Sequence, residues 1–267
     1  MADYPCGVAE PLVARRLNGE RLVIFGWSRA ILMQLAHPLL AAGVAEHSAF
    51  REGPLVAAAR LRQTVAAMLS LTFGDAAAQA RTLAGIQAIH RRVRGRLQTA
   101  VGPFPAGTPY SAEDPELVAW VHVTLLQSVP LAYSQLVAPV SDADWDRFCV
   151  EAAPTARALG ASGPLPETRR ETDAYVARLV GSGRLAVGPD AQALAAAVLR
   201  PFGGLAGPLA RVNWLCTVGW LPEACRRMYG LAWAPRDAAS LDRWTRLVRR
   251  TRRIAPAWAS RWRAAER

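Results

Sequence analysis

Apolar side chains recur at three- and four-residue steps along most of the chain, which is the period of an α-helix. The first long run covers residues 21–44, and the step from His37 to Pro38 predicts a kink or break within it, because proline removes a backbone donor. Pro54 is suited to the first turn of a second helix that runs to Thr72. Asp75 is suited to cap a third helix, extending to about Leu97.

The rest of the chain continues the helical pattern after a loop rich in proline and glycine at 102–110. A helix is predicted from Ser111, bent at Pro130, and another from Ser141 to Gly160. Further helices are predicted at 167–180, 190–199, 209–218, 222–229 and 238–252. Strand patterns, repeats and linkers are nearly absent, so we expect an all-α protein in which residues 1–267 form a single multi-helix domain.

Composition is that of a globular protein, with 52% hydrophobic and 20% charged residues. The net charge is +11 and every basic residue is an arginine, which excludes chemistry based on a Schiff-base lysine. The arginines are spread over the whole chain and match no nucleic-acid-binding motif, so we expect no nucleic-acid partner.

The cysteines and the chain's hydropathy indicate a cellular context. Cys6, Cys149, Cys216 and Cys225 show no CxxC spacing, so free thiols in a reducing compartment are expected. The first ten residues lack a signal-peptide pattern and no uninterrupted apolar run reaches bilayer length, which predicts a cytoplasmic protein.

The C-terminal segment 236–267 intersperses tryptophans and aliphatic residues with arginines. Two interpretations remain open for this segment. Its tryptophans either pack on the body of the protein, or they form an amphipathic helix that makes weak peripheral membrane contact.

Four histidines are candidates for metal or cofactor binding: His37, His47, His90 and His122. No two of them have the i, i+3 or i, i+4 spacing of a helical metal pair, and there is no GxSxG motif for a hydrolase. His90 stands in an otherwise apolar stripe of its helix, where an unsatisfied imidazole would cost about 1–3 kcal/mol. Its partner could be iron, a backbone carbonyl or a water.

A second constellation lies one helix earlier, where Arg60 and Thr64 are four residues apart and share a face with small side chains. Such a face can approach a flat ligand closely. The alternative is a surface arginine beside a half-buried threonine. His122, on a mostly apolar helix, is either a satisfied core residue or an alternative ligand.

Several stretches together resemble the MpaB-type oxygenases, the family that includes the latex-clearing rubber oxygenases. They are Gly26-Trp27-Ser28-Arg29-Ala30 with Gln34 to Pro38 and Gly43 to Ser48, then Ala88-Ile89-His90-Arg91-Arg92-Val93-Arg94-Gly95, then Asp114 to Leu117 with Trp120 to Leu125, and finally Leu221-Pro222 with Arg226 to Trp233. The likeness covers nearly the whole chain in a consistent order.

The resemblance implies a globin-like helical core with a slot for haem b, and an oxygenase that uses O2 on an apolar, isoprenoid or alkene small molecule. It implies His90 as the iron ligand, through Nε2 with Nδ1 held by a carbonyl or water, and Arg60 and Thr64 near the haem. Arg94 and its neighbouring arginines either meet the haem propionates or are solvated. Glu46, His47 and His37 are the candidates for a distal base or second ligand.

The sequence differs from that of a rubber oxygenase in that it shows no export signal. The alternative function is a non-catalytic helical protein that binds an apolar ligand without iron.

Overall fold

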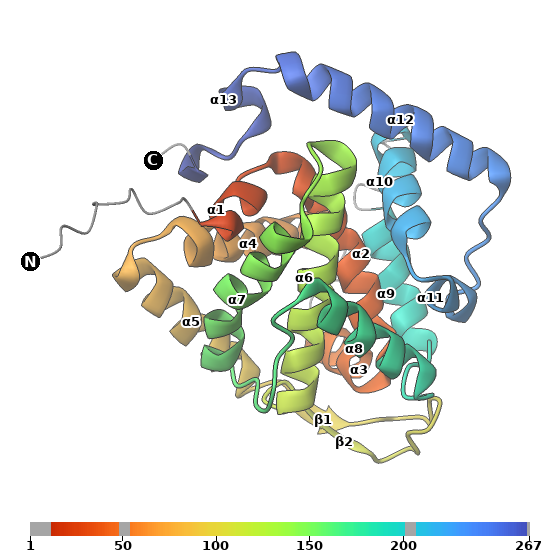
Figure 1. The fold of residues 1–267 in the computed structure, drawn as a ribbon. Helices are drawn as coiled ribbons and strands as arrows, with labels where there is room; N and C mark the ends of the chain where they lie inside the picture. The colour runs from red at the N-terminus through yellow and green to blue at the C-terminus, as the bar shows by residue number, and fades with distance from the viewer. Residues whose placement is uncertain (1–11, 48–53, 201–206, 266–267) are drawn as a thin grey trace, which may run out of the picture.

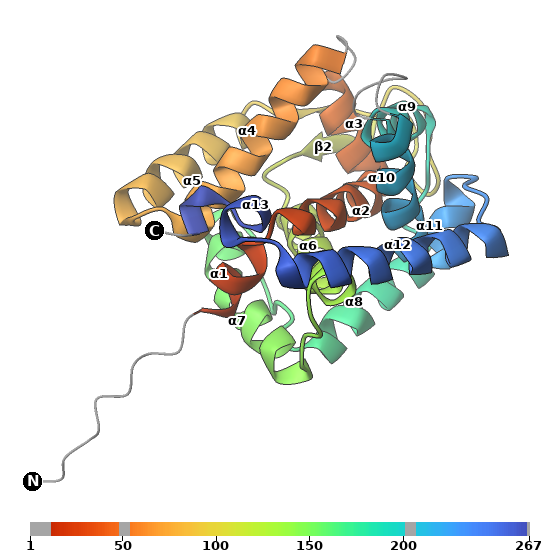
Figure 2. The same ribbon diagram turned by 90° about the horizontal axis from the view of Figure 1, so that it is seen from above.

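Helix α6 (Pro115–Leu136) runs through the middle of the molecule, and helix α2 (Ile24–Leu35) packs along it (Figure 1). The structure is a computed structural model that describes residues 12–47, 54–200 and 207–265, with the backbone alone at 54–61. Helices α4 and α5 lie on one side of α6, helices α9 to α11 lie on the other, and α12 crosses over one end (Figures 1 and 2).

Apart from one two-stranded sheet, the regular elements of the described residues are helices. In addition to α2 and α6, the α-helices are α1 (Val13–Asn18), α3 (Pro38–His47), α4 (Pro54–Phe73), α5 (Ala76–His90), α7 (Asp142–Ala158), α8 (Arg169–Gly181), α9 (Pro189–Leu199), α10 (Gly207–Trp220), α11 (Glu223–Met228), α12 (Pro235–Ile254) and α13 (Ala257–Ser260). The 3-10 turns are η1 (Arg21–Val23) and η4 (Arg263–Ala265), and strand β1 (Arg94–Arg96) pairs antiparallel with β2 (Pro109–Ser111). The predicted all-α class is confirmed.

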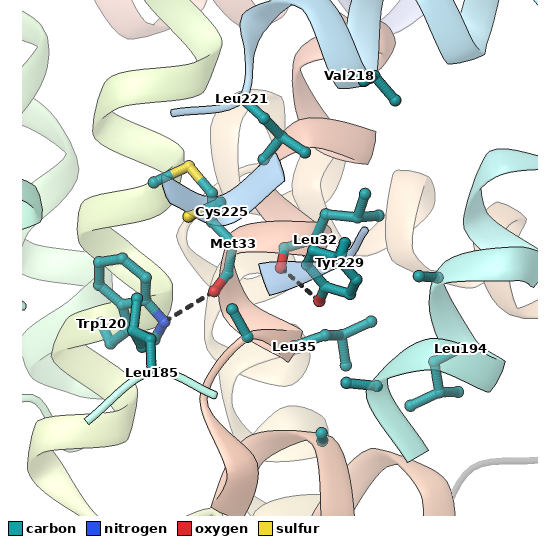
Figure 3. Close-up of a cluster of buried hydrophobic side chains, with 14 of the residues drawn as sticks. Leu32, Met33, Leu35, Trp120, Leu185, Leu194, Val218, Leu221, Cys225 and Tyr229 are labelled. Atoms are coloured by element: carbon teal, nitrogen blue, oxygen red, sulfur yellow. Dashed lines mark hydrogen bonds between the residues drawn. The ribbon is translucent and has the colours of Figure 1, made fainter. Parts of the chain in front are cut away.

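The break predicted at His37-Pro38 separates α2 from α3, and the chain bends there by 108°. The end of α2 leaves carbonyl groups without partners inside the helix. Trp120 Nε1 donates to one of them, the carbonyl of Met33, at 3.2 Å, and the Tyr229 hydroxyl adds a second hydrogen bond, at 2.8 Å, to the carbonyl of Leu32, which also accepts from the backbone N–H of Ala36 (Figure 3). The bend is therefore held by buried hydrogen bonds from α6 and from the residue that follows α11.

Two predicted boundaries were wrong. The third predicted helix, α5, ends at His90 rather than near Leu97, because Arg94–Arg96 pairs with Pro109–Ser111 as a strand. The helix predicted from Ser111 begins at Pro115, where Asp114 caps it by accepting hydrogen bonds from the next turn. Both errors come from a hairpin whose short strands carry no periodic signal.

Within the described residues, the helix α6 is long and apolar enough to cross a bilayer by length and composition, although 67% of the tested window is buried inside the protein. The bent pair formed by 21–35 and 38–47 passes the same test when taken together. A buried core helix meets this test as readily as a membrane span, so the finding is weak support for a span.

Gly26 allows α2 to approach α6 closely. A Cβ added there would lie 2.5 Å from the carbonyl oxygen of Ser128 and 2.8 Å from the Cβ of Ala132. Both are far closer than a van der Waals contact permits. The glycine of the first motif therefore has a packing role.

Replacing Gly26 by alanine should lower the free energy of unfolding by about 2 kcal/mol, because the two helices must separate to admit one methyl group. Gly85→Ala in α5 is the matched control, since a Cβ there meets nothing within 4 Å. That change should leave stability equal or raise it by about 0.5–1 kcal/mol. Urea unfolding of both variants tests the prediction, and equal effects at the two glycines would contradict it.

Candidate functional site: an apolar cavity lined by two histidines

A cavity of about 650 Å³ lies between the α4–α5 pair and helices α6 and α7. Its wall on α6 extends from Leu117 to Val129, a helical length of roughly 18 Å. The wall is mostly apolar, and it includes Leu125 of α6, Met68 of α4 and Phe148 of α7. The volume falls within the range of about 300–1,000 Å³ that is usual for small-molecule and cofactor sites.

Helix α5 has no fully buried residue, although its sequence carries an apolar stripe. Ile86 and Ile89 line the cavity instead of packing into a core, and Ile89 is 52% exposed. Exposed apolar side chains around a cavity of this size indicate a site for an apolar ligand.

His90, the last residue of α5, lines this cavity. Its Nδ1, predicted to be held by a carbonyl or a water, is buried, and no carbonyl of a described residue accepts a hydrogen bond from it. Burial lowers the pKa of His90, opposed by the nearby carboxylate of Glu113. A neutral imidazole is the form that binds a metal.

His122 lines the same cavity from α6. Its Nε2 is buried without a hydrogen-bond partner among the described residues. Burial, with a smaller effect of the Arg157 charge, lowers the pKa of His122 to about 4. The structure thus brings together two of the predicted cofactor ligands, both of them neutral at physiological pH.

A polar cluster lies at the α3 end of the cavity, where Tyr110 donates a hydrogen bond to Glu46. His47 Nε2 lies 3.4 Å from the Tyr110 hydroxyl and 3.2 Å from the carbonyl oxygen of Arg94. Burial, followed by the hydrogen bond to Glu46, raises the pKa of Tyr110 well above its usual value. Gly95 makes room for the cluster, since a Cβ there would lie 2.4 Å from the tyrosine hydroxyl oxygen.

Sequence reasoning missed Tyr110, because it sits in what was predicted to be a loop. Only the pairing of β1 with β2 carries it to the cavity. It also missed the polar end near α1, where Arg15, Asn18 and Thr72 line the cavity. Periodicity carries no signal for such residues, since Tyr110, the α1 pair Arg15 and Asn18, and Thr72 come together from three different elements.

Four other predicted site residues are not among those that line the cavity: His37, Glu46, Thr64 and Arg94. His37 is buried at the α2–α3 bend, with its ring 5.3 Å from that of Phe104. Thr64 is exposed on α4. Arg94 is exposed and pairs with Glu113 at 3.3 Å. Arg60 lies in α4, but its side chain is outside the described residues.

The residues present fit a haem better than a metal held by the protein alone. No group of three or more histidine, cysteine, aspartate or glutamate side chains with metal-binding geometry occurs in the described part of the chain. A porphyrin needs only one protein ligand for its iron. His90 could meet that need, because it lines the cavity and neither of its ring nitrogens makes a hydrogen bond to a described residue.

The three buried cysteines do not contribute to this site. Cys149, Cys216 and Cys225 are free thiols, as predicted. The pKa of each thiol is raised, and burial is the main cause. Cys6 lies outside the described residues.

Comparison with protein-family models identifies the class of this helical, cavity-bearing chain. Residues 14–250 match the family described as ER-bound oxygenase mpaB/B'/Rubber oxygenase, catalytic domain. The chain belongs to this family of oxygenase catalytic domains, which confirms the resemblance seen in the sequence. Searches of curated proteins and of solved structures found no match.

Proposed function

We propose that this protein is a haem-b-dependent oxygenase whose haem occupies the cavity beside α5, with His90 as the iron ligand. The observation that carries the proposal is a neutral imidazole at the wall of a large apolar cavity, with no hydrogen bond to its Nε2 from any described residue. Membership of an oxygenase family supports the reaction class. When bound, the haem iron would supply activation of O2.

The chain's own residues would bind the substrate and hold protons. The apolar wall from α4, α6 and α7 favours an apolar small molecule, such as an isoprenoid or another alkene. Tyr110 and His47 line the cavity, and Glu46, which accepts a hydrogen bond from the Tyr110 hydroxyl, would receive a proton by way of that hydroxyl. His122 is the alternative ligand, because it lines the same cavity from α6.

Haem titration of the purified protein tests the proposal. The wild type should develop a Soret band at one haem per chain. His90→Ala should shift that band and weaken binding by at least about tenfold, since it removes the metal–ligand bond. His47→Ala is the matched control, because it removes an imidazole from the exposed cavity rim and should keep both band and affinity.

An unchanged band and affinity in His90→Ala would refute the ligand assignment. Loss of the band in His122→Ala alone would transfer the role to that residue. The opposite outcome is a wild type that leaves the spectrum of free haem unchanged and binds a fluorescent fatty-acid probe in this cavity. That result would favour a non-catalytic protein that carries an apolar ligand without iron.

A further inference from the structure

The outer face of α12 and the following α13 exposes large apolar side chains. Leu247 is 58% exposed, Ile254 is 85% exposed and Trp258 is 71% exposed. Leu247 and Ile254 are seven residues apart and lie on the same face of α12. Apolar groups of this size gathered in one segment indicate a binding surface.

Arginines surround these side chains. Residues 243–265 contain eight arginines and no acidic residue. Arg246, Arg250 and Arg253 are exposed, and no ion pair or hydrogen bond joins their side chains to a described residue. Unpaired guanidinium groups beside apolar side chains suit an anionic partner with an apolar interior.

The opposite side of α12 packs against the rest of the protein, and the exposed apolar side chains and arginines take no part in that packing. Arg252 forms hydrogen bonds to both carboxylate oxygens of the buried Glu20, at 2.8 and 2.5 Å. Arg249 donates to the carbonyl of Ser134, and Leu241 belongs to a core cluster with α10. Of the two interpretations of this segment, packing on the protein holds for Trp244, whose ring centroid lies 5.4 Å from that of Phe25.

The C-terminal segment that follows α12 lies close to one end of the cavity. The backbone N–H of Trp262 donates to the carbonyl of Gly19 at 3.0 Å, directly after α1. Arg15 and Asn18 of α1 line that end of the cavity. Figure 1 shows α12, α13 and α1 at the same side of the molecule.

We infer that a surface called here the α12 face binds an anionic lipid bilayer; it consists of Arg246, Leu247, Arg250, Arg253 and Ile254 on one side of α12, together with the exposed Trp258 of α13. Aliphatic and indole side chains would enter the interfacial layer while the guanidinium groups meet lipid phosphates. A second copy of the chain fits less well, because a two-fold contact would oppose three arginines on each side with only Asp242 nearby to pair with them. Nucleic acid would leave Leu247 and Ile254 without an apolar partner.

Sedimentation with vesicles tests the inference on the full-length protein. Vesicles of phosphatidylcholine containing phosphatidylglycerol should bind the protein, and vesicles of phosphatidylcholine alone should bind it much less. Arg250→Gln/Arg253→Gln should lower the partition coefficient about 30-fold, because each arginine near an anionic surface contributes about fivefold. The matched control is Arg81→Gln/Arg170→Gln, which removes two exposed arginines elsewhere and should lower binding less than threefold.

Trp258→Ser separates apolar insertion from simple charge attraction, and it should lower binding to the anionic vesicles at high salt, where charge is screened. Equal binding to both vesicle types would overturn the inference that the α12 face binds anionic lipid. Equal losses in the two arginine double variants would overturn it as well. A change of oligomeric state in the Arg250/Arg253 variant without a change in vesicle binding would also overturn it, in favour of a second copy. None of these measurements depends on haem.

Discussion

Replacing Arg29 by alanine is expected to lower the free energy of unfolding by about 4 kcal/mol. This arginine is 3% exposed and joins three helices, since it donates to Ser128 Oγ at 2.5 Å, Gln127 Oε1 at 2.6 Å and the carbonyl of Trp220 at 2.7 Å. Burial lowers the pKa of Arg29 to about 10, yet the guanidinium remains charged at neutral pH. Its removal leaves buried acceptors without a donor and opens a void between α2, α6 and α10.

Chemical unfolding in urea measures this loss, and two further variants identify its cause. Arg29→Lys keeps the charge but cannot reach three acceptors with one ammonium group, so it should recover only part of the stability. Arg170→Ala removes an exposed arginine from α8 and should change stability by less than about 0.5 kcal/mol. A loss at Arg29 no larger than that at Arg170 would show that the buried network contributes nothing net.

Stability should fall as the pH is lowered from neutrality, and His37 should account for part of that fall. Burial first, and then the Arg184 charge, lower the pKa of His37 to about 4, opposed by Asp114 and Glu116. In the unfolded chain the pKa is near its ordinary value of 6.5, so below that pH the unfolded state takes up a proton that the folded state excludes. His37 therefore costs no stability above about pH 6.5. Relative to that pH, it lowers the free energy of unfolding by about 2 kcal/mol at pH 5 and by about 3 kcal/mol below pH 4.

The test compares wild type with His37→Gln, which is polar and does not titrate. Urea unfolding between about pH 7.5 and pH 5 avoids most carboxylate titration, and the stability curve of the variant should be flatter by about 2 kcal/mol over that window. His122 shifts in the same direction, so the variant should retain a shallower slope rather than none. Parallel curves for the two proteins would contradict the assignment to His37.

The first sequence motif therefore has a structural role in this protein. Gly26 allows α2 to touch α6, and Arg29 ties both helices to α10. His37 ends the motif at the bend, where it is buried outside the cavity lining. The resemblance makes His37 a candidate for a distal base or second ligand, and the structure places it outside the residues that line the cavity.

The helices were predictable from local pattern, because a helical segment that packs on one side must show an apolar side chain every three or four residues. The caps at Asp75 and Ser141 and the break at Pro38 were predictable for the same reason, since each depends on bonds within a few residues. The resemblance of the His90 segment to a known motif made that residue a candidate before any fold was known.

Only the tertiary structure decided which apolar stripes are core and which are cavity. The apolar stripe on α5 has the pattern of a helix face buried in a core. Its Ile86 and His90 line the cavity instead, because α5 packs mainly on α4. Tyr110 reaches Glu46 only because β2 pairs with β1, and His122 shares a cavity with His90 only because α5 and α6 line the same cavity. Such contacts join residues far apart in the chain, and periodicity reports only which face of an element is apolar, not what that face meets.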